Sequence, residues 1–353
     1  MGPSVQKNPG GAMPETLVDT GEFGLIDRIK KLLREEGARL PEDTLGIGDD
    51  CASFRSRAGY ELLVTCDCIV EGRHYLPRFI SPIDLGRRAM VLNISDIGAM
   101  GGHTLYALVS LGLRSDTPVK DVEAMYRGFI AELNPFDAAI IGGNLTRSEG
   151  ANFIDITLIG EIESGKSVRR STAKPGDKIL VTGYPGQAAA GLQILLKTIP
   201  VDDVRTHPLV QAYNKPSHRA HEGEAVAKSG LASAMIDTSD GLLGDLGHIC
   251  DESGVGARII QENLPINSAL REAAEQMKHK PLDFVLQDSD DYELIITCPP
   301  EHTDGICSLI TSLTHIPVTE IGEITEKTDG IKLISHNGIL RDITPSGWDH
   351  FAK

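Results

Sequence analysis

The chain has 353 residues, too many for one ordinary hydrophobic core, so its length alone predicts two domains of average size. Apolar residues make up 41% and charged residues 24%, a balance typical of globular proteins and unlike that of disordered or fibrous ones. The formal net charge of −16 argues against nucleic acid and anionic membranes as partners, because those phosphates bind clustered Lys and Arg. Phosphorylated substrates would need metal ions to offset this acidity.

The first predicted segment is a disordered tail over residues 1–20, which lack the apolar run of a signal peptide. No stretch approaches the length of a membrane span. The six cysteines show no CxxC pair and no zinc-site spacing, which favours reduced thiols and a cytoplasmic protein. Cys66 and Cys68 lie two apart in an apolar run, so a strand would direct both to one face, where we expect small core residues.

The predicted elements of the first domain follow from apolar periodicity, and residues 22–35 show the spacing of an amphipathic helix. Next come a strand over 62–70, a helix over 83–100, a strand over 105–113, a helix over 119–133, and strands over 138–141 and 153–159. We expect this α+β domain to cover 21–165.

A Pro-Gly-Asp turn at 175–177 introduces the second domain, expected over 166–353. Its predicted elements are a strand over 178–182, a helix over 187–197, a strand over 232–236, a helix over 241–252, and strands over 257–260 and 293–298.

Four short segments place aspartates beside Gly, Ser or Thr after apolar runs. They are GIGDDCA with Asp49 and Asp50, VTCDCIVEG with Asp67 and Glu71, LNISDIGAMGG with Asn93 and Asp96, and MIDTSDGLLGDL with Asp237 and Asp240. Hard oxygen ligands without paired Cys or His suit Mg²⁺, which completes its coordination with water and substrate phosphates. Alternatively, each Asp caps a helix or forms an Asx turn, and Asp240 is the clearest case. Four such segments in one chain favour a metal cluster.

Two Gly-rich features bear on phosphate binding. A helix that starts just after Ser239 would offer free N–H groups and a positive dipole end to a phosphate. Residues 160–167, GEIESGKS, match the GxxxxGK[ST] phosphate loop, which requires a strand before the loop and a helix after it. A strand is predicted before it, but the residues that follow lack helical periodicity and run into Pro175. We therefore expect a polar turn there, with Lys166 exposed.

Covalent catalysis finds little support, because the chain has no GxSxG motif and no Cys-His pair that stands out by spacing. Phosphoryl transfer needs no protein nucleophile when the acceptor is itself a phosphate monoester, whose second pKa is about 6. His74, three residues after Glu71, is either a surface residue or a substrate contact, and its spacing does not decide between them.

Taken together, the motifs resemble the thiamine-monophosphate kinase family of the aminoimidazole ribonucleotide synthetase superfamily. The resemblance covers residues 21 to 351. It is carried by GEFGLI at 21–26, GIGDD at 46–50, TCDCIVEGRH at 65–74, NISDIGAMGG at 93–102, IGGN at 141–144, DTSDGLLGDL at 237–246, SGVGA at 253–257, DDYEL at 290–294 and GW at 347–348.

The resemblance implies a two-domain PurM-like fold, in which the N-terminal α/β domain forms a dimer-interface β-barrel beside a C-terminal α/β domain. It implies thiamine phosphate and ATP as substrates, several Mg²⁺ ions and a homodimer. By resemblance the magnesium positions are Asp50, Thr65, Cys66, Asp67, Asp96, Asn144, Asp237 and Asp240. The nucleotide positions are Tyr126, Gly143, Asn144, Lys174 and Ser239, and the substrate positions are His74, Asp290, Trp348 and Phe351.

This chain departs from the family pattern at four of these positions. Cys66 stands where Thr is common, Asn144 where Asp is common, Lys174 where Arg is common and Asp290 where Glu is common. Cys66 suits the site if its backbone carbonyl is the ligand, whereas Lys174 lacks the bidentate fork of Arg and Asp290 must reach further.

Other members of the superfamily provide the alternative functions. A selenophosphate synthetase would carry a reactive Cys beside a Lys in its N-terminal segment, and no cysteine precedes Cys51. A hydrogenase maturation factor would end in a Cys-bearing tail, which the last residues lack. A protein that only binds thiamine phosphates would be expected to lack magnesium carboxylates, and this chain has them.

Overall fold

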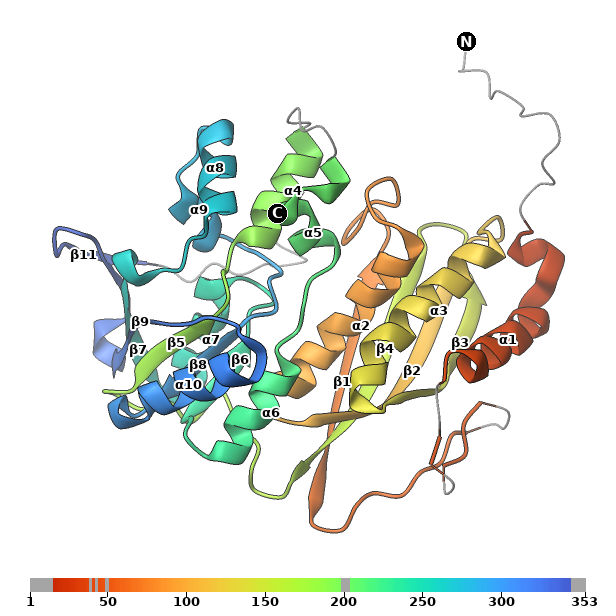
Figure 1. Ribbon diagram of the computed structural model, residues 1–353, viewed down its shortest axis with the longest axis horizontal. Helices are drawn as coiled ribbons and strands as arrows, with labels where there is room; N and C mark the ends of the chain where they lie inside the picture. Colours follow the sequence, from red (N-terminus) through yellow and green to blue (C-terminus); the bar gives the residue numbers. More distant parts are fainter. Residues whose placement is uncertain (1–14, 38–39, 42–43, 48–50, 198–203, 344–353) are drawn as a thin grey trace.

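The structure is a computed structural model that describes residues 15–37, 40–41, 44–47, 51–197 and 204–343. It has two α+β domains that lie side by side (Figure 1). The N-terminal domain contains α1 (Leu17–Glu35), β1 (Tyr60–Val70), α2 (Pro82–Ala99), β2 (His103–Leu113), α3 (Val119–Leu133), the 3₁₀ turn Asn134–Phe136, β3 (Ala139–Arg147) and β4 (Phe153–Glu163). No described helix is both long and apolar enough to span a bilayer.

The four N-terminal strands form one open sheet in the order β1-β4-β2-β3. The pairs of β4 with β1 and β2 are antiparallel, whereas β2 and β3 are parallel. Alternate residues of these strands pack against α1, α2 and α3, because successive side chains of a strand point to opposite faces. Large side chains such as Phe129, Met90 and Ile156 are fully buried in this core.

The opposite face of this sheet is open, which corrects one prediction. Cys66 and Cys68 do share a face of β1, but both are exposed, because the covered face is the one that carries Ile69. Leu62 and Val64 lie on the same open face with 42% and 65% exposure. The four described strands do not close into a barrel.

The C-terminal domain contains a larger sheet whose strand order is β11-β10-β7-β9-β5-β8-β6. Its strands are β5 (Lys178–Thr182), β6 (Ala234–Asp237), β7 (Val255–Ile260), β8 (Leu294–Cys298), β9 (Val318–Glu326), β10 (Ile331–Ile334) and β11 (Leu340–Asp342). Its helices are α4 (Gln187–Lys197), α5 (Pro208–Asn214), α6 (Ala220–Ser229), α7 (Leu242–Ser253), α8 (Ser268–Met277), α9 (Pro281–Val285) and α10 (Thr303–Thr314), and 3₁₀ turns cover Val204–Thr206, Gln261–Asn263, Pro300–His302 and Lys327–Asp329.

Helices cover both faces of this sheet, so its central strands are apolar on both sides. In β5, Ile179 and Val181 belong to the core beneath α4 and α7, whereas Leu180 belongs to the core beneath α6 and α10. The core beneath α6 and α10 also contains Ala99 and Ile162 from the N-terminal domain. The two domains are therefore joined by continuous apolar packing.

Glycines allow α2 and α6 to cross closely where the domains meet. A Cβ atom on Gly223 would lie 2.0 Å from the carbonyl oxygen of Gly98, and a Cβ on Gly98 would lie 2.4 Å from the Cα of Ala220. Side chains larger than hydrogen would separate the two helices. Because α2 carries site residues of the N-terminal domain, this crossing also fixes those residues against the C-terminal domain.

Every predicted helix and strand is present, and those over 119–133, 178–182 and 187–197 have the predicted ends, whereas the others differ at one or both ends. The helix predicted over 22–35 begins at Leu17 and kinks at Gly21, and Thr16 pairs with Pro118, so the predicted tail is wrong for residues 15–20. The strand predicted over 138–141 continues to Arg147 as β3, despite two glycines, because β2 pairs along its whole length. β4 ends at Glu163 and β5 begins at Lys178, and we infer that the domain boundary lies between them.

Gly223→Ala should destabilise the protein, because the new methyl group meets backbone and not a flexible side chain. Overpacking of about 1–3 kcal/mol should outweigh the gain of about 1 kcal/mol from better helix propensity. Lys228→Ala, on the exposed face of the same helix, should change the free energy of unfolding by less than about 0.5 kcal/mol. Urea denaturation of both variants measures the difference, and equal stabilities would refute the close crossing.

Candidate active site

A cavity of about 740 Å³ lies between the two domains. The N-terminal domain contributes the end of β1, the following loop and α2, and the C-terminal domain contributes α4, α5, the β6–α7 turn and the segment before β8. Six predicted site residues line it: Asp67, His74, Asp96, Ser239, Asp240 and Asp290. Residues separated by more than two hundred positions in the sequence thus meet in one cavity.

β1 directs Thr65 and Asp67 toward α2, whereas the side chain of Cys66 points to the open face. The Thr65 hydroxyl donates a hydrogen bond to the carboxylate of Asp96. The backbone N–H of Asp67 donates to the side-chain oxygen of Asn93, 3.2 Å away, which fixes β1 against α2. The Cys66 thiol lies 3.4 Å from Oδ1 of Asp155 on β4, so it is engaged on the face of β1 that points away from α2.

Asn93 and Glu71, which belong to two of the acidic segments, have structural contacts. Asn93 is fully buried and bridges α2 to β1, and its amide nitrogen also donates to the carbonyl oxygen of Ala89. Glu71 pairs with Arg114 at 2.8 Å, outside the cavity lining.

Asp237 is the last residue of β6, and the turn that follows it before α7 carries Ser239 and Asp240. Asp237 accepts a hydrogen bond of 2.5 Å from the Ser95 hydroxyl of α2, so the two domains also meet through a polar contact. Asp240 is not the cap of α7, whose N-cap residue is Gly241. The alternative of a simple helix cap is therefore wrong for this residue, and its side chain lines the cavity.

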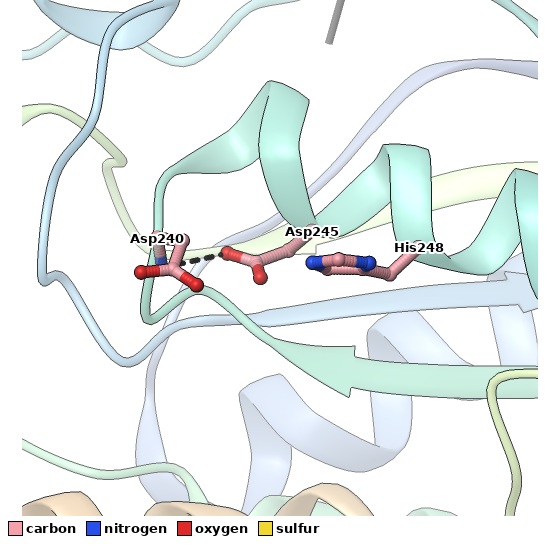
Figure 2. Close-up of side chains that lie close together, drawn as sticks. All are labelled: Asp240, Asp245 and His248. Atoms are coloured by element: carbon pink, nitrogen blue, oxygen red, sulfur yellow. Dashed lines mark hydrogen bonds between the residues drawn. The ribbon is translucent and has the colours of Figure 1, made fainter. Parts of the chain in front are cut away.

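Asp245 holds this turn from within α7 (Figure 2). Its carboxylate, on a residue only 2% exposed, accepts a hydrogen bond of 3.0 Å from the backbone N–H of Asp240. His248 lies one helical turn further on, and the ligand atoms of Asp240, Asp245 and His248 all lie within 4.8 Å of one another. Because His248 is exposed and Asp245 is engaged with the backbone, we assign Asp245 the role of supporting the turn.

The clustered carboxyl groups raise one another's pKa. Burial, the largest cause, and the neighbouring charges of Asp96 and Asp240 together raise the pKa of Asp67 to about 6. Burial and the charge of Asp237 raise the pKa of Asp96 to about 7. Burial, the largest cause, and the charge of Asp67 together raise the pKa of Asp237 to about 6. Such a set of hard oxygen atoms fits divalent cations, which relieve the repulsion among like charges.

One cation that the sequence reasoning missed lies beside this cluster. The positive charge of Arg170 lowers the pKa values of both Asp96 and Asp237, against the effect of burial. Arg170 lies in the segment between β4 and β5, where the sequence reasoning selected Lys174. Lys174 is exposed, and its backbone N–H donates to Asp177. No local pattern distinguished the two residues.

His74 and Asp290 lie on the side of the cavity formed by the loop after β1 and the segment before β8. Nδ1 of His74 accepts a hydrogen bond of 2.9 Å from the backbone N–H of Val70, so the proton of the neutral ring is on Nε2. The Asp290 side chain is 42% exposed and accepts a 2.6 Å hydrogen bond from Arg88. Part of the Asp290 carboxylate is therefore accessible from the cavity.

The remaining predicted nucleotide residues do not line the described cavity. Gly143 and Asn144 lie exposed on β3, and Gly143 has a φ of 150°, where a Cβ atom would lie 1.9 Å from the carbonyl oxygen of Val109. Tyr126 is 4% exposed and packs edge to face against Phe129 in the N-terminal core. Asp49, Asp50, Trp348 and Phe351 lie outside the described residues.

The match to the phosphate loop is a turn, as predicted. β4 ends at Glu163, Lys166 is exposed, and no helix occurs between residues 164 and 177. Without a helix, the N–H groups after Lys166 do not converge on a phosphate.

Comparisons with known proteins show which family the chain belongs to. The family model described as AIR synthase related protein, N-terminal domain, matches residues 48–162, and the C-terminal domain model matches residues 174–333. A thiamine-monophosphate kinase from Salmonella typhimurium is 37% identical over 338 residues, which cover 94% of this chain and 98% of the relative. The chain belongs to the thiamine-monophosphate kinase family.

Solved structures show the same two-domain PurM-like fold. The structure of AaThiL complexed with AMPPCP and TMP is similar with a TM-score of 0.74 and 32% identity, covering 96% of this chain and all of the other. Hydrogenase maturation protein HypE in complex with ATP has the same TM-score of 0.74 at 17% identity, with coverage of 94% and 96%, which is a likeness of fold alone.

Asp96→Asn should stabilise the metal-free protein increasingly as pH rises. The folded pKa of Asp96 is raised to about 7, so the folded state keeps a proton that the unfolded chain releases near its normal pKa. The stability contributed by this group is therefore greatest at low pH and is lost as pH rises through 7. Between pH 5 and pH 8, the advantage of the variant should grow by about 1–3 kcal/mol.

Chemical denaturation in the presence of a chelator measures this change. Asp116→Asn is the matched control for the loss of one carboxylate, because that side chain is 80% exposed. A pH-independent effect of Asp96→Asn would contradict the raised pKa.

Proposed function

We propose that this protein transfers the γ-phosphoryl group of ATP to the phosphate of thiamine phosphate, which gives thiamine diphosphate and ADP. The observation that carries the proposal is the interdomain cavity, which is lined both by repelling carboxylates and by His74 and Asp290. A similar structure holds AMPPCP, which is an ATP analogue, and TMP, which is the acceptor that the family's name gives. Strong similarity over nearly the whole length of kinases in this family supports the same reaction.

Several Mg²⁺ ions are held at the acidic end in this proposal. Their ligands are the eight positions taken from the family resemblance: Asp50, Thr65, Cys66 through its backbone carbonyl, Asp67, Asp96, Asn144, Asp237 and Asp240. The raised pKa values of Asp67, Asp96 and Asp237 support this assignment, because the cluster is electrostatically strained without cations. When bound, the ions neutralise and orient the phosphates.

The nucleotide is bound beside this cluster. Ser239 and the first N–H groups of α7 face the phosphates, and Asp245 keeps that turn in place. The guanidinium of Arg170 supplies a second contact to the phosphates, since its charge already acts on Asp96 and Asp237. Gly143, Asn144, Tyr126 and Lys174 complete the proposed nucleotide site.

Thiamine phosphate occupies the other side of the cavity, with its phosphate directed at the metal cluster. His74 offers Nε2–H as a donor, and the Asp290 carboxylate offers an acceptor and a negative charge for the cationic thiazolium ring. Trp348 and Phe351 are proposed to cover the rings.

No protein base is required for the transfer. The acceptor oxygen is already largely ionised near neutral pH, because the second pKa of a phosphate monoester is about 6. The protein holds the two phosphates in line for the transfer and lowers the electrostatic repulsion between them.

The open face of the N-terminal sheet is the proposed dimer interface. Leu62 and Val64 are large apolar residues left exposed on β1, and a second copy of the chain would cover them and complete a β-barrel from two open sheets. Covering the face would also bury Cys66 and Cys68, which are exposed in the single chain.

Purified protein should phosphorylate thiamine phosphate and leave free thiamine nearly unchanged, because free thiamine offers an alcohol in place of an ionised phosphate. The assay supplies ATP, Mg²⁺ and a panel of phosphorylated vitamins, and the products are identified by mass spectrometry. Equal or faster turnover of free thiamine would refute the mechanism, and preference for another phosphorylated vitamin would refute the substrate.

Asp67→Asn should lower kcat by about a hundredfold or more while the fold is kept, because the change removes a metal-facing charge and little volume. Lys166→Ala is the matched control: it should leave the rate within about twofold, since exposed substitutions change stability by less than about 0.5 kcal/mol. Steady-state kinetics at limiting and excess Mg²⁺ measures both. An inactive Lys166→Ala with an active Asp67→Asn would mean that ATP binds at residues 160–167.

A further inference from the structure

Arg88 is a buried cation at the boundary between the two domains. It belongs to α2 and is only 3% exposed, yet it lines the interdomain cavity. Its Nη2 donates a 2.6 Å hydrogen bond to Oδ2 of Asp290, which is 202 positions away in the other domain. Asp290 is its only ion-pair partner among the described residues.

The flat face of the same guanidinium lies on an aromatic ring. The Arg88 Cζ atom is 4.2 Å from the ring centroid of Tyr213 in α5, a cation–π contact. The Tyr213 hydroxyl in turn donates a 3.2 Å hydrogen bond to the backbone carbonyl of His74. Arg88 of α2 and Tyr213 of α5 thus connect Asp290 with His74, the two residues that we place against thiamine phosphate.

This arrangement is costly to keep without a function. Nη1 of Arg88 is buried and has no hydrogen-bond partner among the described residues. An unsatisfied buried donor on a charged group costs more than one on a neutral group. Burial lowers the pKa of Arg88, but Tyr213 and the neighbouring charge of Asp290 outweigh it and raise the pKa, so the group remains a cation.

We propose that Arg88 is a positioning residue for thiamine phosphate: it holds the Asp290 carboxylate and, through Tyr213, the His74 loop in their substrate-binding arrangement. One Asp290 oxygen is used by Arg88, and the partly exposed carboxylate presents the other to the cavity. The guanidinium itself stays beneath the surface, away from the cationic thiazolium ring. This inference rests on the proposed function.

Helix α2 carries both Arg88 and one member of the carboxylate cluster. Asp96 of the carboxylate cluster lies eight residues later on the same helix, a rise of about 12 Å at 1.5 Å per residue. A rigid helix therefore sets the spacing between the substrate-ring end of the cavity and its metal end. Arg88 links that spacing to Asp290 of the other domain.

A double-mutant cycle between Arg88→Met and Asp290→Asn tests the proposal, with KM for each substrate and kcat measured separately. We expect each single change to raise KM for thiamine phosphate about tenfold and to leave KM for ATP within about twofold. Because both changes break one interaction, the double variant should be no worse than the worse single variant. Independent effects would instead multiply to about a hundredfold.

Matched variants separate positioning from a loss of folding. Arg87→Gln alters the adjacent residue, which pairs with Glu132 at 2.6 Å, and should leave both KM values unchanged. Arg88→Lys keeps the charge without the planar group and should give an intermediate KM. Tyr213→Phe keeps the ring and loses the contact to His74, so a rise of about threefold is expected.

The outcomes decide between the two claims. If the wild-type protein does not use thiamine phosphate, the proposed function fails. If the wild-type protein is active but the cycle is multiplicative, or if KM for ATP rises as much as KM for thiamine phosphate, only the role of Arg88 is refuted. Should Arg88→Met not fold, Arg88→Lys takes its place in the cycle, and an unchanged KM for that variant overturns the proposal.

Discussion

Mutual repulsion among carboxylates gathered where the two domains meet is the main physical constraint on this structure. Asp67, Asp96 and Asp237 come from β1, α2 and β6, and their pKa values are raised because burial and neighbouring charge both disfavour ionisation. Such a cluster opposes the association of the two domains that supply it. The domains are joined instead by the apolar core around Ala99 and Ile162 and by the glycine crossing of α2 with α6. Apolar packing thus stabilises an arrangement whose polar centre favours cations.

Helix α2 transmits this constraint through the molecule. Its apolar face packs on the N-terminal sheet, Ser95 contacts Asp237 of the other domain, and Gly98 permits the contact with α6. Arg88 lies in the N-terminal half of the helix and pairs with Asp290. A change in the tilt of this one helix would alter the metal cluster, the substrate side and the domain interface together, so substitutions along it should show coupled effects.

The sequence predicted what depends on local pattern and failed where the answer depends on partners. The Asp-bearing segments were recognisable because oxygen ligands beside Gly and Ser recur in four places. Periodicity placed Cys66 and Cys68 on one face of β1, but it cannot tell which face the helices cover. The extension of β3 through Gly142 and Gly143 depends on pairing with β2, and the contact of Arg88 with Asp290 spans 202 positions, so neither leaves a local signal.

The segment DDYEL illustrates how a motif can divide its residues between chemistry and folding. Tyr292 has a φ of 54°, a left-handed conformation that disfavours residues other than glycine. The side chains before and after it therefore point in different directions. Asp291 accepts hydrogen bonds from Gly186 and Ala188 at the start of α4, and Glu293 forms a buried pair with Arg219 at 2.6 Å. Only Asp290 presents its carboxylate to the cavity. The strained residue is therefore tolerated because firm contacts on both sides determine its conformation, and their combined effect is to direct one carboxylate at the substrate.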